Sequence, residues 1–204
     1  MFSVIIQAGG KSSRMGTDKL FIPFRDQLLI EWVIDRLANL TDDLIIISSQ
    51  AEKLKYLHQT VYPDVVKDVG PLAGLFTGLK NARYESVVMV ACDMPFVNSR
   101  LLREEVRLLD EMQADVVIPA PGGKTEPLHA AYRRETCLPV IEAGIRSGMR
   151  RLIEWHSLVR VHIMEDEQIR KFDPTRLAFM NINNPEDARL AEQVDLEDEN
   201  HNHP

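Results

Sequence analysis

The chain has 204 residues, of which 45% are hydrophobic and 27% charged, and this ordinary composition predicts one folded globular domain. Its formal net charge of -7 argues against nonspecific binding to nucleic acid, which relies on clustered lysine and arginine. No apolar stretch approaches the roughly 20 residues that span a bilayer, so we expect neither a membrane nor a nucleic-acid partner. The two cysteines, Cys92 and Cys137, lack the number for a disulfide framework and the spacing of a zinc site, and we expect a cytoplasmic protein.

Strand-like and helical patterns alternate along most of the chain. An apolar, β-branched run at residues 2–7 is followed by a long loop, a helical periodicity over residues 28–40 and a second apolar run at residues 44–47. Further short runs predict buried strands at residues 65–66, 87–91, 115–119, 128–132, 159–164 and 179–182. This alternation favours a single-domain α/β fold, with a mainly parallel sheet, helices on both faces and ligands at the carboxyl ends of the strands.

Helix starts and turns are legible at several places. Asn184 offers an N-cap with Pro185 at the first helical position, and Gly70 and Pro71 open another helix by the same logic. A turn at residues 121–124 predicts a hairpin-like excursion over residues 117–132. We assign residues 1–194 to the domain and expect the acidic tail at residues 195–204 to be disordered.

A glycine-rich segment at residues 7–19 directly follows the first predicted strand. Glycine lets main-chain N–H groups approach phosphate oxygens closely, and Lys11, Arg14 and Lys19 add local positive charge. The segment matches neither the Walker A pattern nor the spacing of a dinucleotide-binding loop. By spacing alone a tight structural turn is an equal alternative, but the cations favour a polyphosphate.

An acidic residue stands just after the apolar run at residues 87–91. Asp93 would lie at the ligand edge of a parallel sheet, and Mg²⁺ commonly binds through one or two carboxylates together with substrate phosphates. Asp93 is therefore a candidate Mg²⁺ ligand, with a simple helix cap as the alternative. The neighbouring Cys92 would face the core.

The order of residues in the glycine-rich segment resembles the signature A-G-G-x-S-x-R-M-G-x-D-K of the molybdenum cofactor guanylyltransferases, in the molybdopterin nucleotidyltransferase family. The segment around Asp93 is similar to the C-D-x-P segment of that family, and the likeness covers almost the whole chain except the tail. The resemblance implies a Rossmann-like, glycosyltransferase-A-like nucleotidyltransferase domain with Mg²⁺ bound by Asp93. It also implies that Arg14 and Lys19 act in catalysis, and that the nucleotide contacts Ala8, Gly9, Gly10, Ser12, Arg14 and Lys19.

Residues 68–74 are the candidate for recognition of the base. They resemble the family pattern D-x-x-x-G-P-L-x-G, with a shorter spacer after Asp68. A carboxylate can accept two N–H bonds from a guanine edge, whereas cytosine offers no such pair of donors, so Asp68 favours GTP over CTP. A turn-capping role is the alternative for Asp68. Two departures also concern the nucleotide: Gln7 stands where the family commonly has Leu, and Ser48 where guanylyltransferases often have Asn.

Two later segments, at residues 126–132 and 181–187, resemble family segments that border the acceptor pocket. The resemblance suggests His129, Asn181 and Asn183 as acceptor-binding residues. Asn183 has turn formation as its alternative. His129 is either structural or acceptor-lining rather than a general base, because an ionised phosphate needs no proton removed before it attacks.

The resemblance implies the transfer of GMP from GTP to the terminal phosphate of molybdenum-molybdopterin, which gives the guanine dinucleotide cofactor and pyrophosphate. Catalysis would rest on positioning and on neutralisation of charge by Arg14, Lys19 and the Mg²⁺ at Asp93. Transient contacts with cofactor-insertion proteins or molybdoenzymes would accompany it. Two alternatives stay open: a related nucleotidyltransferase that uses CTP or a sugar or polyol phosphate, and a non-catalytic carrier that binds GTP and the cofactor.

Overall fold

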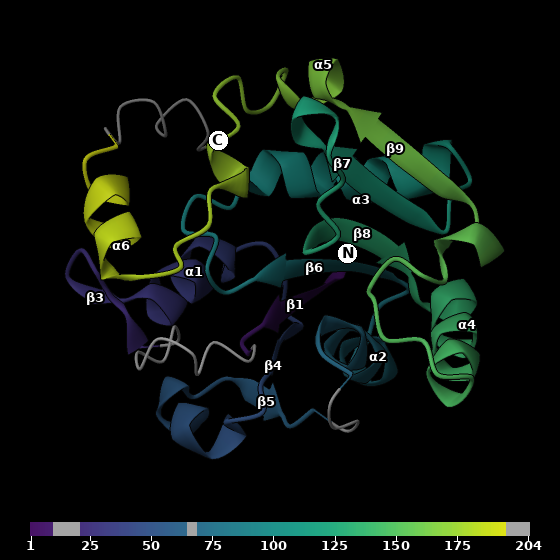
Figure 1. Cartoon of the computed structure of the whole chain (residues 1–204), viewed down its shortest axis with the longest axis horizontal. Coiled ribbons are helices and arrows are strands. Elements are labelled where there is room, and N and C mark those ends of the chain that lie inside the picture. The colour runs from purple at the N-terminus through teal and green to yellow at the C-terminus, as the bar shows by residue number, and fades with distance from the viewer. Residues whose placement is uncertain (10–20, 65–68, 195–204) are drawn as a thin grey trace.

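The computed structural model describes residues 1–9, 21–64 and 69–194, and a seven-stranded sheet forms its centre (Figure 1). Across the sheet the strands are β5 (Thr60–Tyr62), β4 (Leu44–Ile47), β1 (Ser3–Gln7), β6 (Ser86–Ala91), β8 (His129–Arg133), β7 (Val116–Ala120) and β9 (Val161–Glu165). A separate two-stranded sheet pairs β2 (Pro23–Phe24) with β3 (Gln27–Leu28).

All strands of the large sheet except β8 run in one direction. β1 is parallel to β4 and β6, β5 is parallel to β4 and β9 is parallel to β7, whereas β8 is antiparallel to both β6 and β7. The β7–β8 pair confirms the predicted hairpin-like excursion. Because β8 is reversed, its first residue, His129, lies opposite Val90 near the end of β6.

Helices connect most of the strands. The structure contains α1 (Leu29–Leu37), α2 (Pro71–Asn81), α3 (Ser99–Glu111), α4 (Arg134–Arg146), α5 (Asp166–Ile169) and α6 (Pro185–Ala191). Short 3-10 turns are η3 (Ala51–Leu57), η4 (Pro121–Gly123), η5 (His156–Leu158) and η6 (Leu177–Phe179). The predicted start of α2 at Pro71 is confirmed, as is the cap of α6, where the Asn184 side chain accepts hydrogen bonds from the N–H groups of Glu186 and Asp187.

Two apolar clusters cover the opposite faces of the sheet. Val4 and Ile6 point into a cluster with α1 and α3, while Ile5 points into a cluster with α2 and α4, as expected for the alternating side chains of a strand. Figure 1 shows α2 and α4 side by side on one side of the sheet. This arrangement confirms the predicted α/β fold class.

A third apolar cluster lies beside the main sheet. It joins the β2–β3 hairpin, the first residue of α1, the segment after β6 and α6, and its buried members are Ile22, Phe24, Leu29, Phe96, Ile182, Ala188 and Ala191. This cluster therefore brings segments that are far apart in the sequence against the segment that follows β6.

One predicted strand is wrong and three short strands were missed. Residues 179–182 form no strand, because η6 ends at Phe179 and Ile182 is buried in the third cluster instead of pairing with the sheet. β2, β3 and β5 were not predicted. The predicted strand at residues 65–66 and the tail at residues 195–204 lie outside the described residues. Within the described ranges no helix has the length and apolar character needed to cross a bilayer.

Candidate functional site

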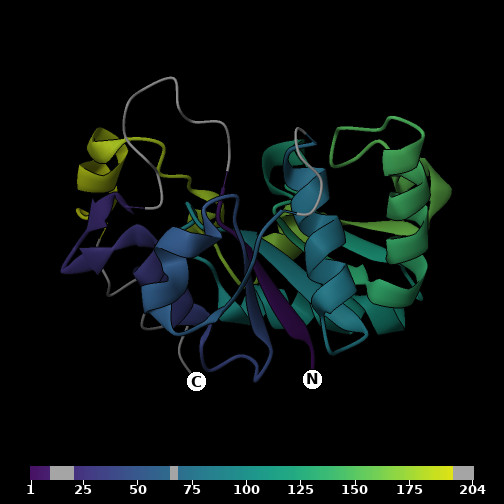
Figure 2. The same cartoon turned by 90° about the horizontal axis from the view of Figure 1, so that it is seen from below.

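The carboxyl ends of β1 and β4 lie against each other. The Ala8 N–H donates to the Ile47 carbonyl at 2.8 Å, and the Cβ position of Gly9 lies 3.6 Å from the Ser49 nitrogen. In Figure 2, β1 rises in purple from the N-terminus, so this ligand edge of the sheet faces upward, and α6 lies on the same side. The beginning of the glycine-rich segment is thus placed at the edge predicted for it, whereas Gly10, Lys11, Ser12, Arg14 and Lys19 lie outside the described residues.

Gln7 packs directly under α2. Its side chain is buried, and its Oε1 has no hydrogen-bond partner in the part of the chain that the structure describes. A Cβ at Gly74 would lie 1.6 Å from that oxygen, so only glycine leaves room for the amide here. Four residues later, a Cβ at Gly78 would lie 2.2 Å from Ile5 Cδ1. Helix α2 thus approaches β1 closely at Gly74, and the close approach continues along α2 to Gly78, which sequence reasoning did not single out.

Ser48 is fully buried at the end of β4. Its N–H donates to the Tyr62 carbonyl at 3.1 Å, and its hydroxyl accepts a hydrogen bond from the Gln50 N–H at 3.1 Å. These contacts form a turn of the kind that serine hydroxyls favour. The base-recognition candidate Asp68 lies outside the described residues.

Asp93 follows β6 at the same edge and is partly exposed. The N–H of Cys92 donates to the Gln7 carbonyl at 3.1 Å, which ties this segment to the end of β1. The Asp93 carbonyl accepts a hydrogen bond from the Ile182 N–H at 2.8 Å. Asp93 therefore lies between the start of the glycine-rich segment and the segment around Ile182.

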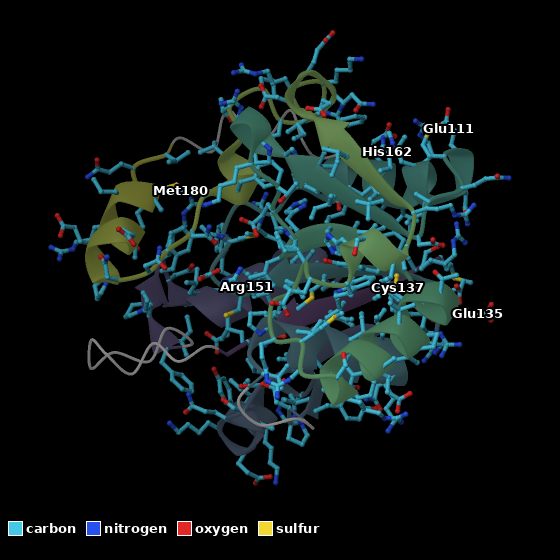
Figure 3. The ribbon with its side chains drawn as sticks, turned by 45° about the vertical axis from the view of Figure 1, so that its right-hand side comes forward. Glu111, Glu135, Cys137, Arg151, His162 and Met180 are labelled. Carbon is cyan, nitrogen blue, oxygen red and sulfur yellow. The ribbon has the colours of Figure 1, made fainter. Side chains whose placement is uncertain are left out.

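Asn181 and Asn183 flank Ile182, so the same hydrogen bond brings both near Asp93. The Asn181 side chain donates to the Phe179 carbonyl at 3.4 Å, and the Asn183 N–H donates to Asp187 Oδ2 at 2.7 Å. Met180 lies on this segment and packs against the third cluster (Figure 3). The structure thus gathers three of the predicted site residues, and the pairing of Asp93 with Ile182 had no sequence signal.

His129 has no exposed surface and contacts a buried acid. Its Nδ1 lies 2.9 Å from Glu105 Oε1, and both side chains are fully buried. Burial raises the pKa of the Glu105 carboxyl, and the nearby His129 acts in the opposite direction. The His129 ring also packs on Phe179, with 5.0 Å between the ring centroids. His129 therefore contacts the segment that leads to Asn181 from within the core. Its partner Glu105, 24 residues earlier in the chain, was not predicted as a site residue.

Both cysteines, Cys92 and Cys137, are buried and have no place in the candidate site. Cys92 is buried in the α1–α3 cluster, in agreement with its predicted core position. Burial raises the pKa of the Cys137 thiol to about 12, and its Sγ lies 3.2 Å from the Asp115 carbonyl oxygen. A thiol with such a pKa carries almost no thiolate at neutral pH, so Cys137 is a core residue.

The single carboxylate of Asp93 suits a metal ion that binds together with a nucleotide. Within the described ranges no three His, Cys, Asp or Glu side chains gather into a cluster that could hold a metal ion. Mg²⁺ requires no such cluster, since it commonly binds through one or two carboxylates while phosphates and water complete its coordination. A single Asp93 beside the start of the glycine-rich segment fits that donor set.

Comparison with known proteins agrees with this geometry. The family model of the MobA-like NTP transferase domain matches residues 4–161. The chain belongs to this family. The match spans β1 to the first residue of β9 and therefore includes the glycine-rich segment, Asp93 and His129.

Relatives of similar length are known for this MobA-like chain. It is 34% identical over 185 residues to the molybdenum cofactor guanylyltransferase of Syntrophotalea carbinolica, covering 91% of this chain and 88% of that protein. It is 33% identical over 202 residues to a protein of Peptoclostridium acidaminophilum named "Probable molybdenum cofactor guanylyltransferase", covering 96% and 90%. The crystal structure of molybdopterin-guanine dinucleotide biosynthesis protein A from Archaeoglobus fulgidus superposes with a TM-score of 0.83 at 30% identity, covering 95% and 98%.

Proposed function

We propose that this protein transfers GMP from GTP to the terminal phosphate of molybdenum-molybdopterin, with release of pyrophosphate and formation of the guanine dinucleotide cofactor. Relatives named molybdenum cofactor guanylyltransferase match it at 33% and 34% identity over at least 88% of their own length. They support a nucleotidyltransferase that acts in molybdenum cofactor biosynthesis. The match covers the whole described domain, so it does not depend on one motif.

One observation of the structure carries the proposal. Two main-chain hydrogen bonds, from Cys92 N–H to the Gln7 carbonyl and from Ile182 N–H to the Asp93 carbonyl, join three segments at one edge of the sheet. A transfer reaction needs a donor site, a site for charge neutralisation and an acceptor site within a few ångströms of each other. The three joined segments supply one candidate residue set for each.

In this proposal the donor nucleotide lies over residues 7–9, where main-chain N–H groups and the glycine-rich segment meet the triphosphate. Arg14 and Lys19, in the undescribed part of that segment, neutralise charge on the phosphates. Asp68 accepts two N–H bonds from the guanine edge, and Ser48 and Gln7 lie at the nucleotide side of the edge. Ala8, Gly9, Gly10 and Ser12 complete the nucleotide-binding set.

Asp93 is the proposed ligand of Mg²⁺. A divalent ion bound with GTP at that carboxylate would supply Lewis-acid stabilisation of charge on the phosphates. Asn181 and Asn183 would orient the acceptor beside Asp93 through their side-chain amides. His129, buried against Glu105, would hold the Phe179 segment in place and take no proton from the acceptor.

The chemistry explains why no general base is needed. The terminal phosphate of the acceptor is already an anion when it attacks the α-phosphorus of GTP, and the bond to the departing pyrophosphate breaks. Positioning and neutralisation of negative charge therefore provide most of the acceleration. The proposal also includes a cytoplasmic location, where thiols such as Cys92 and Cys137 stay reduced, and transfer of the product to cofactor-insertion proteins or molybdoenzymes.

The test is pyrophosphate release with Mg²⁺ and each of the four NTPs, with and without molybdenum-loaded molybdopterin. We expect release with GTP that depends on the acceptor. A preference for CTP would contradict the role of Asp68, release with a sugar or polyol phosphate would contradict the acceptor, and GTP binding without any release would favour a carrier. An Asp110→Asn variant is a suitable control, because this carboxyl lies on α3, is 74% exposed and pairs with Arg133 of β8.

A further inference from the structure

The segment that carries Asp93 is fixed at both ends by hydrogen bonds. We call residues 93–98, between β6 and α3, the Asp93 loop. At its beginning the Asp93 carbonyl accepts from the Ile182 N–H at 2.8 Å. At its end the Asn98 side chain accepts from the Arg100 and Leu101 N–H groups and donates to the Phe172 carbonyl at 3.1 Å. The residues between, at positions 94–97, are all buried.

Helix α1 holds the middle of this loop through two side chains. The Trp32 indole N–H donates to the Pro95 carbonyl at 2.8 Å. The Arg36 guanidinium donates from Nε and from Nη2 to the Val97 carbonyl, each at 3.3 Å. Residues four apart lie on the same face of a helix, so Trp32 and Arg36 contact two carbonyl groups of the loop, those of Pro95 and Val97, which are two residues apart.

Trp32 is itself held in place by the β2–β3 hairpin. The Arg25 guanidinium lies 4.5 Å above the Trp32 ring, and the Phe24 ring meets the indole edge-on with 5.4 Å between centroids. The main-chain N–H of Arg25 in turn donates to Glu192 Oε1 at 2.6 Å. Cation–π and aromatic contacts of this kind restrict the ring. The hydrogen bond to Pro95 is therefore made by a side chain with little freedom of its own.

We propose that Trp32 and Arg36 are positioning residues for the metal ligand. They fix the main chain just after Asp93, so that its carboxylate meets the metal–nucleotide complex without reorganising the loop. Residues that orient a metal ligand without binding the metal themselves typically contribute to metal affinity. Their removal lowers it by about 10- to 100-fold. Loss of either donor also leaves a carbonyl of a buried residue without that partner, which favours a rearranged loop. This inference rests on the proposed function, because it takes Asp93 as the metal ligand.

The second tryptophan of the chain provides a matched control. The Trp155 indole N–H also donates to a main-chain carbonyl at 2.8 Å, that of Leu152, but Trp155 is buried in the α2–α4 cluster. Trp32→Phe and Trp155→Phe therefore remove the same kind of hydrogen bond from the two faces of the sheet. Each keeps an aromatic ring in place of the indole.

The experiment measures Mn²⁺ binding to the full chain in the presence of GTP, from the loss of the free Mn²⁺ electron paramagnetic resonance signal. We expect Trp32→Phe to weaken Mn²⁺ binding by about tenfold and Trp155→Phe to leave it unchanged. Arg36→Met, which removes both donors but keeps an apolar stem, should act like Trp32→Phe. Arg36→Lys should restore part of the affinity, because its ammonium offers one donor to the Val97 carbonyl.

Amide hydrogen exchange without metal or nucleotide supplies a second measurement. The N–H groups of Met94 and Val97 donate within this region, to the Ala91 and Met94 carbonyls, and report whether the loop opens. We expect exchange at residues 92–97 to become roughly tenfold faster in Trp32→Phe and in Arg36→Met, and unchanged in Trp155→Phe. This change would arise before any metal binds.

The outcomes separate the inference from the function on which it rests. Wild-type affinity for Mn²⁺ in Trp32→Phe and Arg36→Met would overturn the positioning role while leaving the function intact. An equal loss in Trp155→Phe would also overturn it, since the effect would then follow general destabilisation. A wild-type protein that binds no Mn²⁺ with GTP would overturn the role of Asp93, and the inference with it. If Trp32→Phe does not fold, the two Arg36 variants decide the question.

Discussion

The two helical layers of this protein contact the sheet in different ways. On the α2–α4 side, contact depends on shape: Gly74 and Gly78 let α2 approach β1 so closely that a Cβ at Gly78 would lie 2.2 Å from Ile5 Cδ1. On the α1–α3 side, directional polar contacts accompany the apolar cluster, with Glu105 bonded to His129 at 2.9 Å and Trp32 bonded to the Pro95 carbonyl at 2.8 Å.

The difference suggests a division of labour between the layers. Close packing of apolar groups stabilises the fold but has little direction, whereas a hydrogen bond to one atom fixes a position. The polar contacts of the α1–α3 side meet the Asp93 loop and the segment that leads to Asn181. Substitutions on the α2–α4 side should therefore reduce stability first, and substitutions on the other side should reduce the order of the site.

The largest effect is expected at Asp93, where the site residues meet. Asp93→Ala should lower turnover on the order of a thousandfold, because loss of the proposed metal ligand removes about 3 to 5 kcal/mol of transition-state stabilisation. The melting temperature should change little, since the side chain is partly exposed. Steady-state pyrophosphate release and thermal unfolding measure the two quantities, with Asp110→Ala as the control. Near-normal turnover would refute the metal assignment.

His129→Ala tests the polar side of the comparison. Removal of one partner of a buried pair costs about 3 to 5 kcal/mol of unfolding free energy near neutral pH. Burial already raises the Glu105 pKa and His129 opposes that rise, so the variant should raise it further. A carboxyl whose pKa is raised in the folded state makes its full contribution to folding stability at pH values below its unfolded pKa of about 4.3. That contribution is lost as the pH rises through the folded-state pKa.

Urea unfolding of His129→Ala at pH 5 and pH 8 checks this sign. The loss of stability should be smaller at pH 5 than at pH 8, because the raised pKa makes protonation of Glu105 in the folded chain more favourable at the lower pH. The double variant Glu105→Met with His129→Leu should recover most of the stability at both pH values, because no buried charge is then left alone. A loss that is equal at pH 5 and pH 8 would contradict this account of Glu105.

Gly78→Ala tests the packed side. The new Cβ meets three atoms of the buried Ile5 side chain within 3.0 Å, so we expect a loss of about 1 to 3 kcal/mol in unfolding free energy despite the better helix propensity of alanine. Gly144→Ala in α4 is the matched control, since its Cβ meets the flexible Met149 side chain instead. Denaturant unfolding compares the two. A drop in turnover without a drop in stability would break the proposed division between the layers.

Gln7→Leu should give the smallest change. Gln7 Oε1 is buried and lacks a partner among the described residues, so an apolar side chain of similar size should stabilise the fold by about 1 kcal/mol. Gln193→Leu, at an exposed position, serves as the control. Thermal unfolding without nucleotide measures both variants. Destabilisation by Gln7→Leu would mean that the amide has a contact on which the folded chain depends.

Local patterns predicted much of the fold. Long apolar runs located β1, β4 and β6, and capping residues located the starts of α2 and α6, because these signals act within a few residues. The run at residues 179–182 misled because an apolar segment buried in a side cluster looks the same as a strand. β5 was missed because three residues, with Thr60 exposed, give too short a pattern.

The residues of the candidate site could be proposed one by one from the sequence, but not the contacts that bring them together. Asp93, Asn181 and Asn183 carried recognisable patterns, but nothing local shows that Ile182 bonds to the Asp93 carbonyl. The partner of His129 was equally hidden, because a buried Glu105 in the polar pattern of α3 resembles any solvated glutamate. Contacts between distant segments depend on how the layers pack, which sequence periodicity does not encode.

The hydrogen bond from Ile182 to Asp93 also joins a segment that is made late in synthesis to one that is made early. Every strand of the large sheet has been made once the chain reaches Glu165, the last residue of β9. The segment with Asn181 and Asn183 follows only afterwards, and it must return across 89 residues to reach Asp93 (182 − 93 = 89). Closing so long a loop costs conformational entropy, and the contacts that offset this cost are available once the rest of the domain is in place. A ribosome-bound chain can thus make every strand of its large sheet before the segment with Asn181 and Asn183, the proposed acceptor side, is joined to Asp93.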